Sequence, residues 1–69
     1  METLDQLRIR AGLQVTELTK LADVSETSYR KMVRGDPVGK VLIYKVLRVL
    51  SNRLGREITL GDVSGLNPL

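Results

Sequence analysis

The sequence predicts an all-α domain of five helices, the last of them a single turn, with a possible short extended segment near its C-terminal end. Two observations support this prediction. Apolar residues recur every three or four positions in successive segments instead of alternating. Most of these segments follow a residue that favours helix starts and precede a glycine or a turn. A chain of 69 residues forms one small domain, and we assign residues 1–64 to it and residues 65–69 to a tail.

The first two helices are predicted from their end signals. Thr3 and Gln6 have the spacing of a capping box, so the first helix is expected from about residue 3 to Gly12, where the glycine ends it. The second helix is expected from about Val15 to Ala22. Its apolar side is formed by Val15, Leu18, Leu21 and Ala22.

The third helix has the clearest start. A short turn at Asp23 and Val24 leads to Ser25, which is a favoured N-cap residue, and Glu26 then lies in the first helical turn. We expect this helix to continue to Gly35. Its inward side is formed by Tyr29, Met32 and Val33.

The fourth helix is predicted to be the longest. Asp36 and Pro37 supply a cap and a first-turn proline, and the helix is expected from about Pro37 to Leu54. Val41 and Tyr44 lie outside its apolar arc. That arc is broader than the stripe that a surface helix commonly buries, and it contains Leu42, Ile43, Val46, Leu47, Val49, Leu50 and Leu54.

The residues after Gly55 carry weaker signals. Residues 57–60 are expected to start as an extended segment, followed by a turn of helix over residues 60–63. Residues 64–69 contain glycine and proline, and we expect them to fray.

Composition excludes several classes of function. The chain has no Cys and no His, so it lacks disulfides, thiolate nucleophiles and the commonest general base and metal ligand. No glycine-rich phosphate loop or metal-ligand cluster is present, and we expect neither an enzyme nor a cofactor or metal site. No apolar run approaches the about 20 residues of a membrane span, and the start of the chain lacks a signal-peptide pattern. We expect a cytoplasmic protein.

The charges are unevenly distributed. Residues 30–56 carry eight basic and one acidic side chain, whereas the flanking segments are each net negative. A solvated helix face usually mixes both signs, so this block favours a polyanion as the partner. The alternative is a basic surface that has no partner.

The second and third helices resemble a known DNA-binding motif. The stretch GLQVTELTKLADVSETSYRKMVRG, residues 12–35, is similar to the helix-turn-helix of the Cro and phage-repressor family, the Xre-type regulators, with the motif at about residues 14–34. The resemblance extends over roughly residues 4–55 and implies a lambda-repressor-like fold that binds double-stranded DNA. Val15 departs from the family pattern, because members usually have a phosphate-gripping Gln there, and Gln14 precedes it by one residue.

The resemblance implies which side chains contact DNA. Base readout is expected from outward residues early in the third helix, which are Glu26, Thr27, Ser28 and Lys31. Phosphate contacts are expected from Gln14, Arg30, Arg34 and Lys40.

Simpler interpretations exist for several of these residues. Glu26 can serve only the helix dipole, because an acid in the first turn is favoured whatever the function. Lys31 and Arg34 can be ordinary solvated charges, and Gln14 a plain surface residue. Tyr29 is expected in the core with its hydroxyl at the rim, the alternative being a stacking or phosphate-contact role.

A small chain without disulfides has little stability to spare, and the fourth helix has more apolar surface than one small core needs. We therefore expect a homodimer with an interface at Val49, Ile58, Leu60 and Val63. The function expected is a transcriptional regulator, in particular a repressor that binds a palindromic operator. The alternatives are an antitoxin, which would add a protein partner, and a recombination accessory factor.

Overall fold

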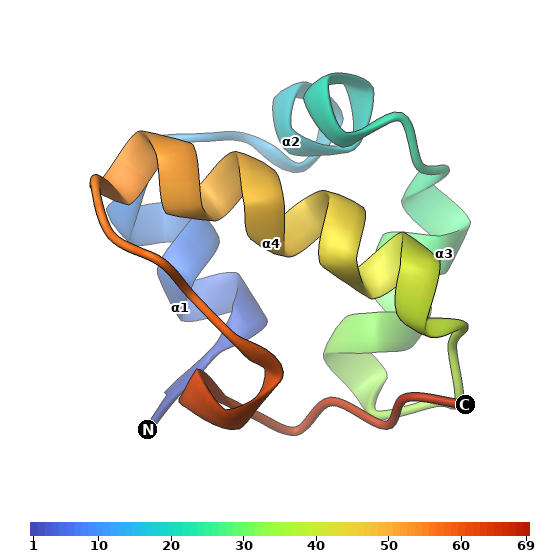
Figure 1. Cartoon of the computed structure of the whole chain (residues 1–69). Helices are drawn as coiled ribbons and strands as arrows, with labels where there is room; N and C mark the ends of the chain where they lie inside the picture. Colours follow the sequence, from blue (N-terminus) through green and yellow to red (C-terminus); the bar gives the residue numbers. More distant parts are fainter.

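The computed structural model describes residues 1–69 and contains four α-helices, not the five helices that the sequence suggested (Figure 1). The fifth is only a turn of 3-10 helix, η1. Two strands of two residues each complete the secondary structure. The bounds are β1 Glu2–Thr3, α1 Leu4–Arg10, α2 Val15–Ala22, α3 Glu26–Arg34, α4 Lys40–Leu54, η1 Leu60–Asp62 and β2 Val63–Ser64.

Helix α1 begins with the predicted capping box. The hydroxyl of Thr3 accepts from the backbone N–H of Gln6 at 3.2 Å, and the Gln6 side chain accepts from the Thr3 N–H at 2.9 Å. These bonds satisfy two of the N–H groups that a helix start leaves without partners. Leu4 and Leu7, three residues apart, are buried, so the side of α1 that carries them faces the core.

Helices α2 and α3 have the predicted bounds and are joined by three residues. Asp23 ends α2 in the left-handed conformation, with φ 58°, which Asp tolerates better than most residues. Ser25 caps α3, because its hydroxyl accepts from the Ser28 N–H at 3.0 Å. Gly35 closes α3 with φ 84°. Local signals are therefore sufficient to set both ends of this helix pair.

Two of the residues assigned to inward faces are exposed instead. Leu21 is 54% exposed and Val33 is 44% exposed. The inner side of α2 centres on Leu18 and Ala22, and Thr19 turns inward beside them. Burial of Thr19 is possible because its hydroxyl donates to the backbone carbonyl of Val15 at 2.9 Å.

Helix α4 begins at Lys40, three residues later than predicted, because the preceding segment pairs with the end of the chain. The N–H of Val38 donates to the Asn67 carbonyl at 3.1 Å, and the N–H of Leu69 donates to the Val38 carbonyl at 2.9 Å. A backbone engaged in this bridge cannot also be helical. The same bonds hold residues 67–69 in place, so the expected fraying of the tail is wrong.

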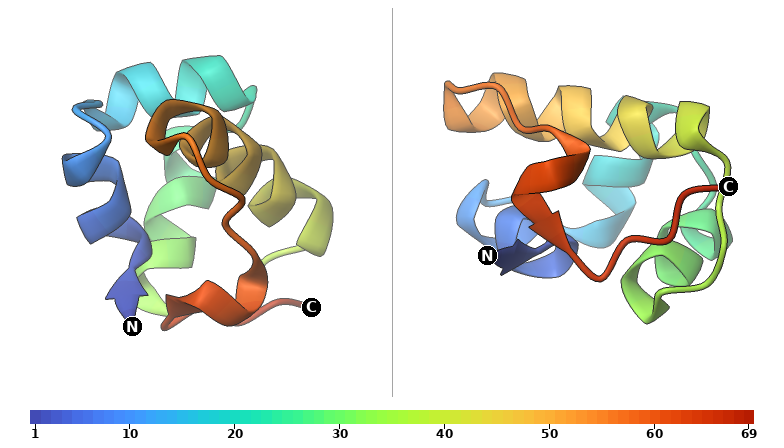
Figure 2. Two further views of the ribbon diagram at one scale, coloured as in Figure 1. Left: turned by 60° about the vertical axis from the view of Figure 1, so that its left-hand side comes forward. Right: turned by 60° about the horizontal axis from the view of Figure 1, so that its bottom comes forward.

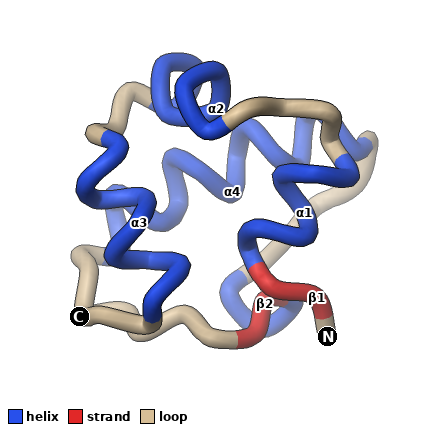
Figure 3. Tube along the Cα trace, turned by 180° about the vertical axis from the view of Figure 1, so that it is seen from behind, coloured by secondary structure: helices blue, strands red, loops and turns tan.

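The two ends of the described chain also meet in a small parallel sheet. Glu2 of β1 pairs with Val63 of β2, and Thr3 pairs with Ser64. Figure 3 shows the two strands side by side below α1, with α4 behind the other three helices.

The segment after α4 is fastened by Ser51, whose hydroxyl donates to the Leu47 carbonyl at 2.7 Å and accepts from the Ile58 N–H at 2.9 Å. Its path from α4 to η1 is seen in the two views of Figure 2. One apolar core lies between the helices and this segment. Its 14 members are Leu4, Leu7, Leu13, Leu18, Ala22, Tyr29, Met32, Val38, Ile43, Val46, Leu47, Leu50, Ile58 and Val63. Leu54, which belongs to the predicted apolar arc of α4, packs only at the margin of this core.

Candidate nucleic-acid interface

The outer face of α3 presents two side chains with no partner inside the chain. Thr27 and Lys31 are exposed, and neither side chain makes a hydrogen bond or an ion pair. They occur four residues apart, so they project from the same side of the helix in adjacent turns. Both are therefore free to contact an external group.

The other two candidate readout residues are engaged within the chain. The carboxylate of Glu26 accepts from the Arg30 guanidinium at 3.1 Å, one helical turn later. The Ser28 hydroxyl, which is half-buried, accepts from the Ser25 hydroxyl at 3.0 Å. Glu26 thus has a specific partner beyond the helix dipole, and its second carboxylate oxygen has no partner within the chain.

The two arginines of α3 are paired but exposed. Arg34 donates to one oxygen of Asp36 through Nε and Nη2, at 3.0 and 2.8 Å. The side chains of Arg30 and Arg34 are each 61% exposed. Exposed ion pairs contribute only about 0–1 kcal/mol, so an external anion can replace either carboxylate at little cost.

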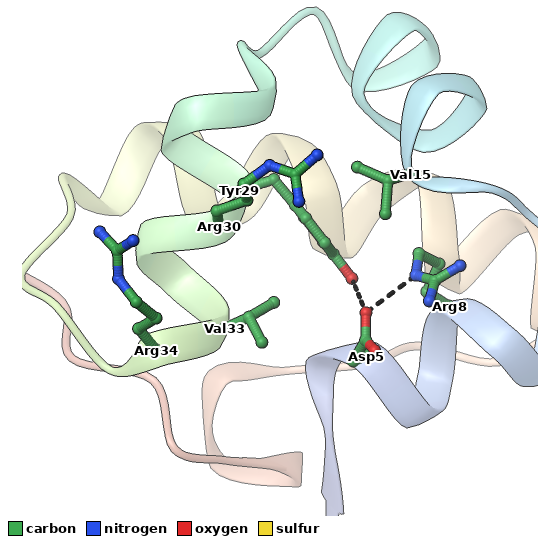
Figure 4. Close-up of a pocket in the computed structure, with 7 residues that line it drawn as sticks. All are labelled: Asp5, Arg8, Val15, Tyr29, Arg30, Val33 and Arg34. Carbon is green, nitrogen blue, oxygen red and sulfur yellow. Dashed lines mark hydrogen bonds and ion pairs between the residues drawn. The ribbon is translucent and has the colours of Figure 1, made fainter.

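A pocket of about 360 Å³ lies between α1, the start of α2 and α3 (Figure 4). Val15 and Val33 form apolar parts of its wall, and three guanidinium groups surround it. The lining residues are Asp5, Arg8, Val15, Tyr29, Arg30, Val33 and Arg34. Arg8 was missed by the sequence analysis, because it lies in the net acidic first third of the chain and joins α3 only through the tertiary structure.

Tyr29, Asp5 and Arg8 form a hydrogen-bonded network at the base of this pocket. The Tyr29 hydroxyl and the Arg8 Nε each donate to Asp5 Oδ1 at 2.9 Å, and Arg8 Nη1 donates to the Leu13 carbonyl at 2.8 Å. The ring of Tyr29 is buried in the core with its hydroxyl at the pocket, as predicted. A buried ring cannot stack on bases, so the stacking role for Tyr29 is excluded in this conformation, whereas a phosphate contact through its hydroxyl stays a prediction.

This network changes the acidity of its members. The hydrogen bond from Arg8 holds the pKa of the Asp5 carboxyl below its usual value, although partial burial opposes this effect and Tyr29 assists it. Burial raises the pKa of the Tyr29 phenol well above its usual value, and the hydrogen bond to Asp5 adds to the increase. The ionised carboxylate and the neutral phenol are thus the favoured forms at neutral pH.

Gln14 lies at the N-cap of α2 with an exposed side chain. Its backbone N–H is already used, because it donates to the Glu17 carboxylate at 3.0 Å. A phosphate at this helix start would have to share that N–H with Glu17 or displace it. The Gln14 side chain itself is accessible.

The basic block of the sequence does not form a single cluster. Arg30, Lys31 and Arg34 lie on α3, whereas the remaining charges lie on or just after α4. Lys40 is exposed in the first turn of α4 without an ion-pair partner. The other members are Lys45, 3.9 Å from Asp23, Arg56, 3.9 Å from Glu2, and the unpaired Arg48 and Arg53. Only part of the +7 charge therefore belongs to the α3 surface.

The residues assigned to a dimer interface are mostly engaged in the core of the chain itself. Ile58 and Val63 are only 4% and 5% exposed, so they have no side-chain surface for a partner, and the prediction for these two is wrong. They are buried because the segment after α4 folds back onto the core. Val49 and Leu60 are half-buried and pack against that core.

No protein-family model matches the sequence, and neither a curated protein nor a solved structure has significant similarity to the chain. None of the helices has the length and apolar character that crossing a bilayer requires. No group of three or more acidic side chains is arranged to hold a metal ion.

Proposed function

We propose that this chain is a sequence-specific double-stranded DNA-binding protein in which α2 and α3 act as a helix-turn-helix. The observation that carries the proposal is the pair of unpartnered side chains, Thr27 and Lys31, on the outer face of α3. That helix is joined to α2 by a three-residue turn, and exposed arginines flank it. In a helix-turn-helix the second helix enters the major groove and its first residues meet the base edges.

The side-chain chemistry of α3 suits the major groove. Lys31 reaches the O6 and N7 acceptors of guanine, and Thr27 contacts a thymine methyl group or forms a hydrogen bond with a base. Glu26 accepts from the amino group of cytosine. The ion pair with Arg30 uses one oxygen of Glu26, so readout uses the second oxygen or follows the transfer of Arg30 to a phosphate.

Phosphate binding is assigned to the cations around the α3 surface. Arg30 and Arg34 exchange their carboxylate partners for phosphate oxygens, and the pocket beside Arg8 provides room for a phosphate next to them. Lys40 extends the contact beyond α3, and Gln14 adds a neutral hydrogen bond. These contacts supply affinity and orientation but not sequence discrimination.

Among DNA-binding proteins of this class, we propose that the chain is a homodimeric repressor that occupies a palindromic operator. The chain is 27 Å in its longest dimension, and successive major grooves on one side of DNA lie about 34–36 Å apart. One copy thus covers one groove, and two copies side by side span the two half-sites. Occupation of a promoter then blocks transcription.

The test is a selection of bound sequences from random duplex DNA with the full chain. The proposal expects an enriched motif with two-fold symmetry and half-site centres separated by about one helical turn. Lys31→Ala should weaken the enrichment at the base that Lys31 reads, whereas Arg53→Ala should leave it unchanged, because Arg53 lies in the last turn of α4, at the end remote from α3 (Figure 1). Absence of enrichment with the wild-type chain would refute sequence-specific binding.

A further inference from the structure

The solvent-facing side of α4 carries an apolar ridge that its own fold leaves uncovered. Val41 is 68% exposed and Tyr44 is 49% exposed, although both belong to a helix whose opposite side is fully packed. They are three residues apart and thus adjacent on the helix surface. Together they present adjacent apolar side chains that the fold itself does not cover.

A groove of about 280 Å³ adjoins this ridge, between α4 and the segment that follows Gly55. Tyr44 forms one wall, and Leu47 and Ile58 contribute apolar atoms to its lining. Its charged residues are Arg48 of α4 and Glu57 of the following segment. A convex ridge and a concave groove therefore lie next to each other on one side of the molecule.

Neither charged side chain of this groove has a partner elsewhere in the chain. Glu57 is the single side-chain carboxylate without a hydrogen bond or an ion pair. Arg48 also lacks any carboxylate partner. The two groups line the same groove but do not form an ion pair with each other.

We propose that Val41, Tyr44, Arg48 and Glu57, called here the α4 face, join this chain to a second copy of itself about a two-fold axis. Arg48 of each copy pairs with Glu57 of the other, and the Val41–Tyr44 ridge of each copy packs beside the groove of the other. A two-fold axis makes every contact twice, so a face with one cation and one anion at separate positions complements itself. A face of a single charge sign would repel its own copy.

The α4 face replaces the interface predicted from Ile58 and Val63, which are core residues. It deepens the proposed function by naming the surface that would bring two α3 helices together. The dimer is nevertheless measured without DNA, so this inference and DNA binding can fail independently.

The test is sedimentation of the full chain and its charge variants at micromolar concentration without DNA. Wild-type protein should dimerise, whereas Arg48→Glu and Glu57→Arg should each weaken self-association by roughly tenfold or more, since each homodimer would contain like-charge pairs. An equimolar mixture of the two variants should dimerise again. In that heterodimer, the Glu at position 48 of one chain meets the Arg at position 57 of the other, and the native Arg48 and Glu57 form the second pair.

Two controls make the result decisive. Arg53→Glu changes an unpaired arginine outside the α4 face and should leave the dimer unchanged, whereas Tyr44→Ala should weaken it without any change in charge. Circular dichroism checks that all variants are folded. A monomeric wild-type chain, single variants that dimerise normally, or a mixture no better than its components would each overturn the α4 face. If such a monomer still selected a DNA motif, the proposed DNA binding would stand without this surface.

Discussion

The hydroxyl of Tyr29 on α3 donates a 2.9 Å hydrogen bond to the carboxylate of Asp5 on α1, across 24 positions of the chain. Arg8 binds the same carboxylate oxygen from the other side. The candidate recognition helix is thus held to α1 by a polar contact as well as by core packing. Its orientation depends on residues that belong to neither α2 nor the turn.

Replacing Tyr29 with Phe should test this contact, because the ring and its packing remain. We expect a loss of about 1.5–3 kcal/mol in the free energy of unfolding, which is typical of a hydrogen bond to a charged group. Urea denaturation measures it. Tyr44→Phe is the matched control, because the Tyr44 hydroxyl has no partner and its removal should change stability by less than about 0.5 kcal/mol. Equal losses in both variants would mean that the Asp5 contact contributes nothing specific.

The stability of the fold should decrease in acid through Asp5. Its pKa is lower in the folded than in the unfolded chain, chiefly because Arg8 donates to it. The group therefore stabilises the fold above its unfolded pKa of about 4, and this contribution is lost as the pH falls through the lower folded value.

Asp5→Asn should therefore flatten the decline in thermal stability below about pH 4. Asp62 provides a comparison, because hydrogen bonds from Thr59 also lower its pKa but it lies on the surface, away from the pocket. Asp62→Asn should leave the hydrogen bond between Tyr29 and Asp5 intact. The ultraviolet titration of the Tyr29 phenol measures whether that bond is present. An acid profile that Asp5→Asn leaves unaltered would contradict the assigned role of Asp5.

The ionisation of Tyr29 should lower the stability of the fold at alkaline pH. Burial raises its pKa in the folded state, so folding favours the neutral phenol and the stabilisation is complete below the unfolded pKa of about 10. Stability should decline as the pH rises above that value, and the decline should be smaller in Tyr29→Phe. Thermal denaturation at successive alkaline pH values measures the difference. The same slope in both proteins would argue against this titration.

The affinity for duplex DNA should decrease steeply with salt if the cations around α3 bind phosphates. Arg34→Ala and Lys40→Ala should each reduce the slope of log Kd against log salt by about one. Arg53→Ala, at the far end of α4, should leave that slope unchanged. Fluorescence anisotropy with a labelled duplex provides the measurement, and binding that is insensitive to salt would rule out these contacts.

Base readout should separate from phosphate binding in the variants of α3. Lys31→Ala and Thr27→Ala should cost about 1–3 kcal/mol on the selected site and little on random DNA, since only base contacts discriminate. Equal losses of binding free energy on both DNAs would mean that these residues only position the helix and do not read bases. Glu26→Gln should change the preferred base more than the affinity, and an unchanged preference would leave Glu26 as a partner of Arg30 and the helix dipole.

The end signals of α2 and α3 could be recognised from the sequence because they act over a few residues. Ser25 caps the helix that it precedes, Gly35 ends it, and Asp23 adopts the left-handed turn, all through bonds to near neighbours. The amphipathic spacing of Tyr29 and Met32 likewise predicted their burial. Local backbone and rotamer preferences are sufficient for these features, whatever the rest of the chain does.

Local sequence signals could not predict three other features. These are the start of α4 at Lys40, the pairing of residues 67–69 with Val38 and the burial of Ile58. Val38 is in the extended conformation because residues 67–69 bond to it, some 30 positions away, and β1 meets β2 across almost the whole chain.

Some features of the α3 surface could likewise be predicted from the sequence, and others could not. Its outward residues and the pairing of Glu26 with Arg30, one helical turn apart, follow from helical periodicity, but the presence of Arg8 beside them depends on which side chains meet in space. Contacts between residues far apart in the chain gain their energy only after the loops between them close. No short stretch of sequence records that energy.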